Sequence, residues 1–248
     1  MRIGIFGTGH IGKTLAMRLS AAGHEVKVAN SRGPDNIPAD ILSSGAIAST
    51  TEAAIQEIDV LILSIPLERL PGVASLVAKV SDETVVIDTS NYYPHRDNKI
   101  DLIESGQTES VWVMKQLGRP VAKAWNAIGS ATLSSKDKPD GEPGRLAVPV
   151  AADRERDREV AMALVSDSGF DAYDAGALEQ SWRQQPGAPC YCTELTKDEM
   201  GAALGAAQKD RLPKRRDLAV AVIQERVGDP KTNPDADFST KLSRIIFM

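Results

Sequence analysis

The feature that most constrains this chain is a run of glycines near its N-terminus. Residues 7–12 read Gly-Thr-Gly-His-Ile-Gly, with the spacing G-x-G-x-x-G. The run follows the apolar segment Ile3–Phe6, opens a segment with helical periodicity over Ile11–Ala22, and precedes a second β-rich segment, Glu25–Ala29. The glycine pattern is weak by itself. A strand, a glycine turn, a helix and a second strand in this order predict a dinucleotide-binding βαβ unit.

Residues 1–175 alternate short β-rich segments with helical ones, which predicts an α/β fold with a doubly wound, Rossmann-type parallel sheet. Strands are expected at Ile3–Phe6, Glu25–Ala29, Val60–Ile65, Thr84–Asp88, Val121–Trp125, Arg145–Val150 and Phe170–Tyr173, with a short further strand at Gly45–Ala48. A helix is expected over Arg154–Ser168, with Asp153 as its N-cap. The polar, turn-rich segment Ser134–Gly144 is expected to be a solvated loop.

After Gly176 the alternation stops, and residues 176–248 predict a small helical C-terminal appendage. The chain is therefore divided into a cofactor domain, 1–175, and a substrate or dimerisation appendage, 176–248. Helical segments are expected around Leu178–Gln185, Lys197–Lys209 and Asp217–Val227, followed by an apolar terminus, Leu242–Met248. The apolar run 245–248 favours docking of the terminus on the sheet domain or on a second subunit, and it motivates a homodimer.

Charge and composition exclude several classes of protein. The chain has 29 Lys and Arg against 34 Asp and Glu, a net charge of −5, and 4% aromatic residues, so nucleic acid is not the expected ligand. No segment approaches the ~18 uninterrupted apolar residues of a membrane span. Cys190 and Cys192 are too close in sequence for a disulfide between them to stabilise a fold of this size. This favours a reducing, cytoplasmic location. With three histidines in the chain, no metal site is expected.

The end of the second strand indicates which dinucleotide is bound. An NAD site requires Asp or Glu about twenty residues after the third glycine, where it binds the ribose hydroxyls. This chain has Asn30, Ser31 and Arg32 there. A hydroxyl and a guanidinium suit a phosphate on the ribose 2′ oxygen, so NADP is the expected cofactor.

Four segments together resemble a known family. The glycine run at 7–12, Asn-Ser-Arg-Gly-Pro at 30–34, Ser-Ile-Pro at 64–66 and Val-Ala-Lys-Ala-Trp-Asn at 121–126 are similar to the NADP-dependent oxidoreductases related to the deazaflavin (coenzyme F-420)-dependent NADP reductases. The resemblance covers about residues 1–175. It implies that the glycine loop, Ser31 and Arg32 bind the phosphates and that Ser64, Ile65 and Pro66 line the nicotinamide side. The tail after Gly176 departs from the pattern, so a deazaflavin does not follow as the substrate.

The complete set expected to contact the cofactor is Gly7, Thr8, Gly9, His10, Ile11, Gly12, Asn30, Ser31, Arg32, Ser64, Ile65, Pro66, Asn126 and Ala127. The second reactant should lie beyond the carboxyl ends of the strands, near the nicotinamide. Candidates there are Asn91, Tyr92, Tyr93, His95, Lys123, Asn126, Ala127 and Ile128. If 91–95 is extended, at most one of the adjacent tyrosines points inward. Lys123 forms either a buried ion pair or a substrate contact.

No residue is identified as the catalytic group. Lys123, Asn126 and Tyr191 are the weak candidates. The basic cluster Lys209, Arg211, Lys214, Arg215 and Arg216 is expected to be a solvated helix end. The sequence favours an NADPH-dependent reductase that transfers a hydride to a small molecule: a deazaflavin, a flavin, an imine or a carbonyl compound. The alternatives are a hydroxyacid-type dehydrogenase and a sensor that binds NADPH without turnover.

Overall fold

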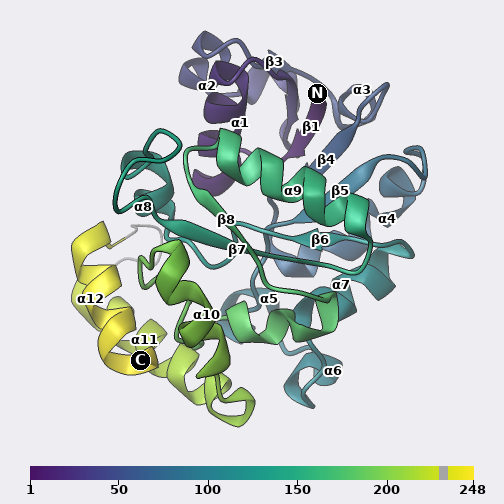
Figure 1. The fold of residues 1–248 in the computed structure, drawn as a ribbon. Helices are drawn as coiled ribbons and strands as arrows, with labels where there is room; N and C mark the ends of the chain where they lie inside the picture. The colour runs from purple at the N-terminus through teal and green to yellow at the C-terminus, as the bar shows by residue number, and fades with distance from the viewer. Residues whose placement is uncertain (229–233) are drawn as a thin grey trace.

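The computed structural model describes residues 1–228 and 234–248, which are arranged around an eight-stranded sheet with helices on both faces (Figure 1). The strands are β1 (Arg2–Phe6), β2 (Glu25–Ala29), β3 (Ile47–Ala48), β4 (Val60–Leu63), β5 (Val85–Asp88), β6 (Ala122–Lys123), β7 (Ala147–Ala152) and β8 (Asp171–Asp174). The α-helices are α1 (His10–Ala21), α2 (Ala39–Ser43), α3 (Thr51–Ala54), α4 (Leu70–Val77), α5 (Pro94–Asp97), α6 (Asp101–Glu104), α7 (Glu109–Leu117), α8 (Ser130–Ser135), α9 (Glu155–Asp167), α10 (Lys197–Gly205), α11 (Leu212–Val227) and α12 (Ala236–Phe247). Short 3-10 helices are η1 (Pro34–Asn36), η2 (Leu67–Arg69), η3 (Leu178–Gln184) and η4 (Lys209–Arg211).

The strand order, β3-β2-β1-β4-β5-β6-β7-β8, confirms the doubly wound α/β fold. Strands β3 to β6 are parallel, and Ile5 of β1 lies between Val28 of β2 and Ile62 of β4. The sheet is nevertheless only mostly parallel, because β7 runs antiparallel to β6 and β8 is parallel to β7. The chain leaves β6 through α8 and a loop and re-enters at the same edge of the sheet, so β7 must run back along its neighbour.

Apolar residues on both faces of the strands explain why the sheet is covered on both sides. In β4, Val60 and Ile62 belong to the core that contains Leu15 of α1 and Leu164 of α9. The alternate residues of β4, such as Leu61, belong to a second core with α4 and α7. A parallel strand buried on both faces reads as a continuous apolar run, as this one does. The carboxyl end of β4, where the Ser64–Pro66 segment begins, is therefore anchored in a strand that is buried on both faces.

Two local predictions need correction. Asp153 does not cap α9: Arg154 is the N-cap residue, and Asp153 Oδ1 instead accepts a hydrogen bond from the Leu178 amide at 2.9 Å. The first residues of the expected loop 134–144 belong to α8. The rest of that loop is tied to other segments of the fold: Arg18 of α1 binds Asp137 at 2.6 Å, and the Lys138 amide donates to the Gly169 carbonyl.

The C-terminal helices pack against the sheet domain of the same chain. A third apolar cluster joins Ala147 of β7 to Leu195, Met200 and Leu204. Phe247 is 2% exposed and packs edge-on against Tyr191, with 6.3 Å between ring centroids. The terminus therefore docks on its own chain. The division at residues 175 and 176 stays a prediction.

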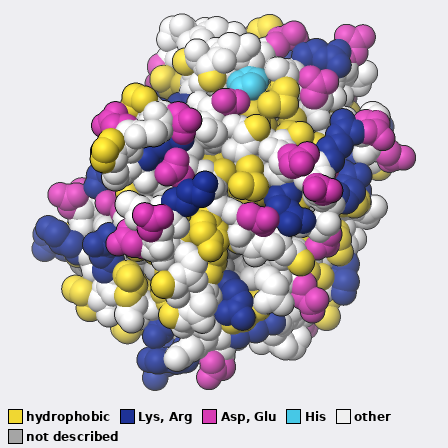
Figure 2. Space-filling model, in the orientation of Figure 1, with side chains coloured by type: hydrophobic (Ala, Val, Ile, Leu, Met, Phe, Trp, Pro, Cys, Tyr) yellow, Lys and Arg dark blue, Asp and Glu magenta, His cyan; other side chains and the backbone are white. Residues whose placement is uncertain are grey.

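The basic segment 209–216 is not solvated throughout, because Arg216 is 6% exposed. Its guanidinium carbon lies 5.3 Å from the centroid of the Tyr92 ring, and its Nε donates to Asp217 at 2.7 Å. On the face drawn in Figure 2, acidic and basic side chains are interspersed and do not gather into a patch of one charge. Within the part of the chain that the structure describes, none of the helices has the length and apolar character needed to cross a membrane.

Candidate functional site

The glycine run forms the turn from β1 into α1, and its three glycines have different surroundings. Gly7 has a φ of 105°, and a Cβ on it would overlap the Ser64 carbonyl. A Cβ on Gly12 would overlap the Gly7 carbonyl. Gly9, by contrast, has no heavy atom within 4 Å of the position where its Cβ would lie. Gly7 and Gly12 are thus required by the fold, whereas the space in front of Gly9 is open to a ligand at the N-terminus of α1.

A cavity of about 710 Å³ extends from this loop across the ends of β2 and β4. Its wall brings together many of the expected cofactor contacts: Gly7, Thr8, Gly9, Asn30, Ser31, Arg32, Ser64, Ile65 and Pro66. Asn30 braces the turn, since its Nδ2 donates to Thr8 Oγ1 at 3.2 Å and its Oδ1 accepts from the Arg32 amide at 2.8 Å. Within residues 1–228 and 234–248, the Arg32 guanidinium has no hydrogen bond or ion pair.

Arg69 also lines this cavity, and the sequence analysis did not identify it. It ends η2, a single turn of helix after the Ser64–Pro66 segment, and its Nε lies 3.2 Å from Glu68 Oε1. Its side chain is 73% exposed, so it remains available to a ligand. The signal was an arginine shortly after the carboxyl end of β4, but only the fold shows that it faces the same cavity as Arg32.

A second cavity, of about 370 Å³, continues from the first and shares Gly9 and the Ser64–Pro66 segment with it. It runs past the carboxyl ends of β5 and β6, as the sequence predicted for the second reactant. Its other lining residues are His10, Ile11, Thr89, Ser90, Asn91, Tyr93, Arg96, Trp125, Asn126, Ile128, Gly129, Ser130, Tyr191 and Cys192. Ser90 Oγ is buried in this wall and has no hydrogen-bond partner among the described residues.

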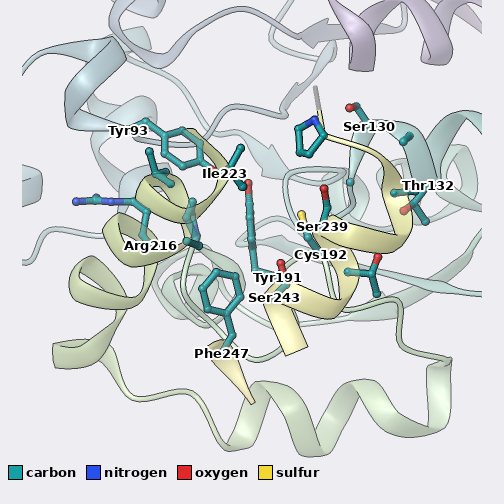
Figure 3. A pocket seen from close by; sticks show the side chains of 18 residues that line it. Tyr93, Ser130, Thr132, Tyr191, Cys192, Arg216, Ile223, Ser239, Ser243 and Phe247 are labelled. Carbon is teal, nitrogen blue, oxygen red and sulfur yellow. Dashed lines mark hydrogen bonds between the residues drawn. The ribbon is translucent and has the colours of Figure 1, made fainter. Parts of the chain in front are cut away.

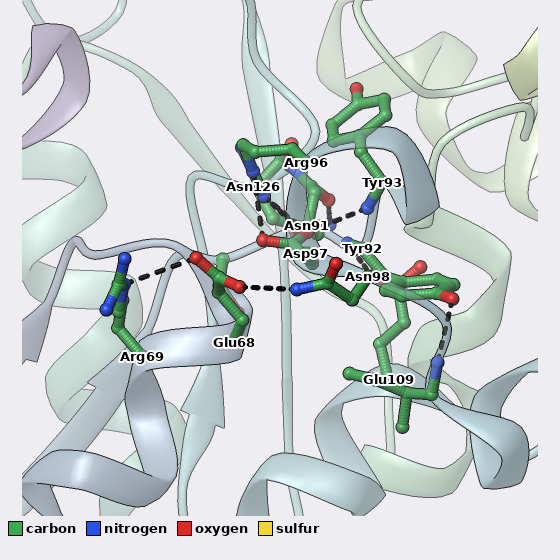
Figure 4. A network of polar contacts seen from close by, with 12 residues as sticks. Glu68, Arg69, Asn91, Tyr92, Tyr93, Arg96, Asp97, Asn98, Glu109 and Asn126 are labelled. Atoms are coloured by element: carbon green, nitrogen blue, oxygen red, sulfur yellow. Dashed lines mark hydrogen bonds and ion pairs between the residues drawn. The ribbon is translucent and has the colours of Figure 1, made fainter.

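A polar network fixes the floor of the second cavity (Figure 4). Asn126 donates to Asn91 Oδ1 at 3.2 Å and to the Gln184 carbonyl at 2.8 Å, and its Oδ1 accepts from Gln184 Nε2 at 2.9 Å. The Arg96 guanidinium grips both oxygens of Asp97, at 3.0 and 2.8 Å. With its side-chain donors and acceptor all engaged, Asn126 positions the cavity wall and joins β6 to the C-terminal tail.

Tyr93 and Tyr191 meet at the far side of this cavity, with 2.7 Å between their hydroxyl oxygens. Asn91 Nδ2 also donates to the Tyr191 hydroxyl, at 3.2 Å. Burial raises the pKa of both tyrosines, so both remain protonated at neutral pH. Burial likewise raises the pKa of the neighbouring Cys192 thiol to about 12, which makes it a poor nucleophile.

Five of the expected residues lie outside both cavity walls, and one of them is Gly12, which packs against the Gly7 carbonyl. Lys123 is fully buried, and its Nζ binds Asp88 Oδ2 at 2.7 Å and the Ser90 carbonyl, so it forms the structural ion pair and not a substrate contact. Ala127 is buried with its carbonyl accepting from the Cys192 amide. Tyr92 is buried and accepts from the Ile100 amide at 3.1 Å, while His95 packs against the Tyr93 ring from outside the cavity.

Of the two adjacent tyrosines only Tyr93 faces the cavity. Tyr92 is held in the core partly by Glu109 of α7, whose Oε2 accepts from the Tyr92 amide at 3.1 Å. Glu109 is 2% exposed, and burial raises the pKa of its carboxyl to about 7. No sequence pattern indicates that Glu109 is buried, because its burial depends on the packing of α7 against η3 of the C-terminal tail.

Comparison with known proteins agrees with the geometry. Residues 2–92 match the family model of NADP oxidoreductases, coenzyme F420-dependent. The crystal structure of the hypothetical protein SMa0349 from Sinorhizobium meliloti is similar, with 30% identity, a TM-score of 0.67, and coverage of 80% of this chain and 96% of that one. A candidate F420-dependent NADP-reductase from Arthrobacter sp. FB24 shares the fold, with 18% identity, a TM-score of 0.57, and coverage of 95% and 98%.

Among curated proteins, YjhV of Escherichia coli (strain K12) is 45% identical over 71 residues, which is 29% of this chain. The match spans 52% of that protein, so about half its length is represented here. NADP is the cofactor of the matching family, and the open space at Gly9, the unpaired Arg32 and the adjoining cavity fit it. Over residues 2–92 the chain matches the NADP oxidoreductase, coenzyme F420-dependent family, a family of NADP-dependent oxidoreductases.

Proposed function

We propose that this protein is an NADPH-dependent reductase that passes a hydride directly to a small molecule held beside the nicotinamide. The observation that carries the proposal is the continuity of the two cavities through Gly9 and the Ser64–Pro66 segment. A dinucleotide lies across such a crevice in a doubly wound sheet, with its pyrophosphate at the N-terminus of the first helix. The remaining space lies at the ends of β5 and β6, where the acceptor would bind.

The residues of the first cavity would bind and orient the adenosine half. The amides at the start of α1, from His10 onward, point toward the space where the pyrophosphate would lie, and the helix dipole favours its charge. Ser31 and Arg32 would bind the 2′-phosphate, with Arg69 across the cavity as a second cation. The described wall of this cavity contains no Asp or Glu, and the carboxylate of Glu68 pairs with Arg69 from beside it.

The residues of the second cavity would orient the reacting half. When bound, NADPH supplies a hydride from its nicotinamide ring. Ile65 and Pro66 offer an apolar surface for one face of that ring, and Ser90 Oγ is an unpaired polar group within the same wall. Tyr191 and Cys192, from the C-terminal tail, help to exclude water from the other side.

Cofactor selectivity tests this proposal. Dissociation constants for NADPH and NADH are measured by calorimetry on the wild-type protein and on Arg32→Ala. Arg32→Ala should weaken NADPH far more than NADH, because only NADPH carries the 2′-phosphate. Lys79→Ala, which removes an exposed cation outside the described cavity wall, serves as the control. An equal loss of affinity for both nucleotides would refute the proposal that Arg32 binds the 2′-phosphate.

The two alternatives make different predictions. A hydroxyacid-type dehydrogenase needs a catalytic lysine, and the described wall of the second cavity has none. A sensor would bind NADPH tightly without oxidising it in the presence of deazaflavin, flavin, imine and carbonyl acceptors. Steady oxidation with any of these acceptors favours the reductase.

A cytoplasmic location and a homodimer are further parts of the proposal. Phe247 is buried against its own chain, but Ile245 is 81% exposed and Met248 is 63% exposed. These two side chains remain available to a second subunit. A concentration-independent monomer mass in solution would rule the dimer out.

A further inference from the structure

A third cavity, of about 220 Å³, lies under α11 and α12 and adjoins the second cavity (Figure 3). The two cavities share Tyr93, Gly129, Ser130, Tyr191 and Cys192. The wall on the tail side includes Ala219, Val220 and Ile223 of α11 and Phe247 of α12. We call this space the tail chamber. At the two tyrosines it borders the second cavity, where the nicotinamide would lie.

The tail chamber suits a neutral ligand. Its described wall is built from aliphatic and aromatic side chains and hydroxyl groups, and Arg216 is its one charged residue. In Figure 3 the Arg216 guanidinium points away from Tyr191 and the chamber, and its Nε is bound to Asp217. An anionic ligand group would lose its hydration there without gaining a cation.

The size of the tail chamber also restricts the ligand. Since a water molecule occupies roughly 30 Å³ of liquid, a space of about 220 Å³ corresponds to about seven waters. A compound of about five to eight heavy atoms, such as a short branched or aromatic aldehyde, is of this order. A three-ring deazaflavin is too large to enter it.

Counting hydroxyl protons identifies the polar edge of the chamber. The Tyr93 and Tyr191 hydroxyls share one hydrogen bond, so one of their two protons is used between them. Asn91 is a donor to the Tyr191 oxygen, so this contact does not use the hydroxyl proton of either tyrosine. Among the described residues, the two hydroxyls have no other oxygen or nitrogen partner, and the Cys192 thiol beside Tyr191 is a weak acceptor. Whichever tyrosine donates to the other, the pair keeps one donor for a ligand.

We propose that the tail chamber binds a small neutral carbonyl or imine compound, and that the Tyr93–Tyr191 pair donates a hydrogen bond and then a proton to its carbonyl oxygen or imine nitrogen. The proposal rests on the reductase function proposed above. It narrows the acceptor from four chemical classes to one. It also assigns the proton donor that hydride transfer to a carbonyl or imine requires.

The step balances as follows for a carbonyl. The acceptor carbon forms a bond to the hydride delivered by NADPH, which is oxidised to NADP⁺. The electron pair of the C=O π bond moves to oxygen, and that oxygen takes a proton from the tyrosine pair. The pair regains its proton from water that enters the second cavity when the alcohol leaves.

The first test is binding, which needs no turnover. Isobutyramide, a neutral and unreactive carbonyl compound of six heavy atoms, is titrated by calorimetry into cofactor-free and NADP⁺-saturated protein. Tyr→Phe at whichever of Tyr93 and Tyr191 donates to the ligand should weaken its binding about 2- to 10-fold, because one neutral hydrogen bond is lost. Tyr173→Phe, which lies in β8 outside the described cavity walls, is the matched control and should bind it normally.

Two further measurements separate a proton donor from a residue that only shapes the cavity. With isobutyraldehyde as acceptor, Tyr→Phe at the donating position should lower kcat about 10²- to 10⁴-fold. NADPH affinity should stay unchanged. Ile223→Trp, which fills the tail chamber from α11, should abolish isobutyramide binding while NADPH still binds.

The outcomes distinguish this proposal from the one on which it rests. Wild-type protein that reduces a deazaflavin, but neither binds isobutyramide nor reduces isobutyraldehyde, overturns the chamber proposal and leaves the reductase intact. Phenylalanine variants that match the wild type in both assays overturn the role of the tyrosines. Protein that binds isobutyramide but never NADPH refutes the reductase function while the chamber stands.

Discussion

Gly9→Ala should separate the fold of this protein from its ability to bind NADPH. The added methyl group would meet no heavy atom within 4 Å, and the backbone at Gly9, with φ −71° and ψ −178°, is open to alanine. Alanine is a poorer N-cap residue than glycine, but it also restricts the unfolded chain. These effects oppose each other, so the free energy of unfolding should change by no more than about 1 kcal/mol.

The same methyl group occupies the space in which the pyrophosphate would approach the backbone. Losing two charge-assisted hydrogen bonds to backbone amides, at about 1.5–3 kcal/mol each, would cost about 3–6 kcal/mol. At about 1.4 kcal/mol for each factor of ten, NADPH should bind about 10²- to 10⁴-fold more weakly. Titration of NADPH by calorimetry gives the affinity, and chemical denaturation gives the stability.

Two matched glycine substitutions act as controls. Gly205→Ala, at the end of α10, also adds a methyl group to open space and should alter neither property by much. Gly12→Ala should destabilise the fold, because its Cβ would overlap the Gly7 carbonyl. A stable Gly9→Ala protein with wild-type NADPH affinity would refute the placement of the pyrophosphate.

Three further predictions concern other parts of the molecule. Lys123→Met should destabilise the protein by about 3–5 kcal/mol, measured by denaturation, because it leaves Asp88 buried without its partner; a neutral result would contradict a structural ion pair. Burial raises the pKa of Glu109 to about 7, so the folded state holds a proton that the unfolded state releases near pH 4.5, and stability should fall by about 3 kcal/mol as pH rises from 4.5 to 7. Glu109→Gln should flatten this dependence, and identical pH profiles for the two proteins would refute it. Arg69→Ala should weaken the binding of NADPH more than the binding of NADH, though less than Arg32→Ala does. Calorimetry with both nucleotides measures this, and an effect on NADH alone would contradict it.

The fold and the cofactor side of the site were largely predictable because their signals are local. The glycine spacing, the apolar run before it and Arg32 lie within one βαβ unit, and the backbone there dictates the residue types. The direction of β7 was not predictable, because no local sequence pattern indicates whether segment 124–146 crosses the sheet or returns to the edge from which it left. The same limit applies to Asp153, which fits an N-cap but instead binds the Leu178 amide.

The reacting side of the site depends on contacts between distant segments. Tyr93 and Tyr191 are 98 residues apart, and their pairing follows from the docking of the tail beside the ends of β5 and β6. Ala127 and Lys123 have the right sequence positions but are turned into the core, because the short strand β6 is followed by a sharp turn in which Trp125 has a φ of 57°. Such turns decide which of several adjacent residues faces a cavity, and composition does not reveal them.

The most direct test of the central claim is the transfer of deuterium from NADPH labelled at C4 of the nicotinamide. Wild-type protein is incubated with NADPH labelled on either face and with isobutyraldehyde, an imine, a flavin or a deazaflavin, and the products are examined by mass spectrometry. A reductase that acts by direct hydride transfer will deliver the label from one face only to its acceptor. Tight binding of NADPH with no label in any product would contradict the account and favour a sensor.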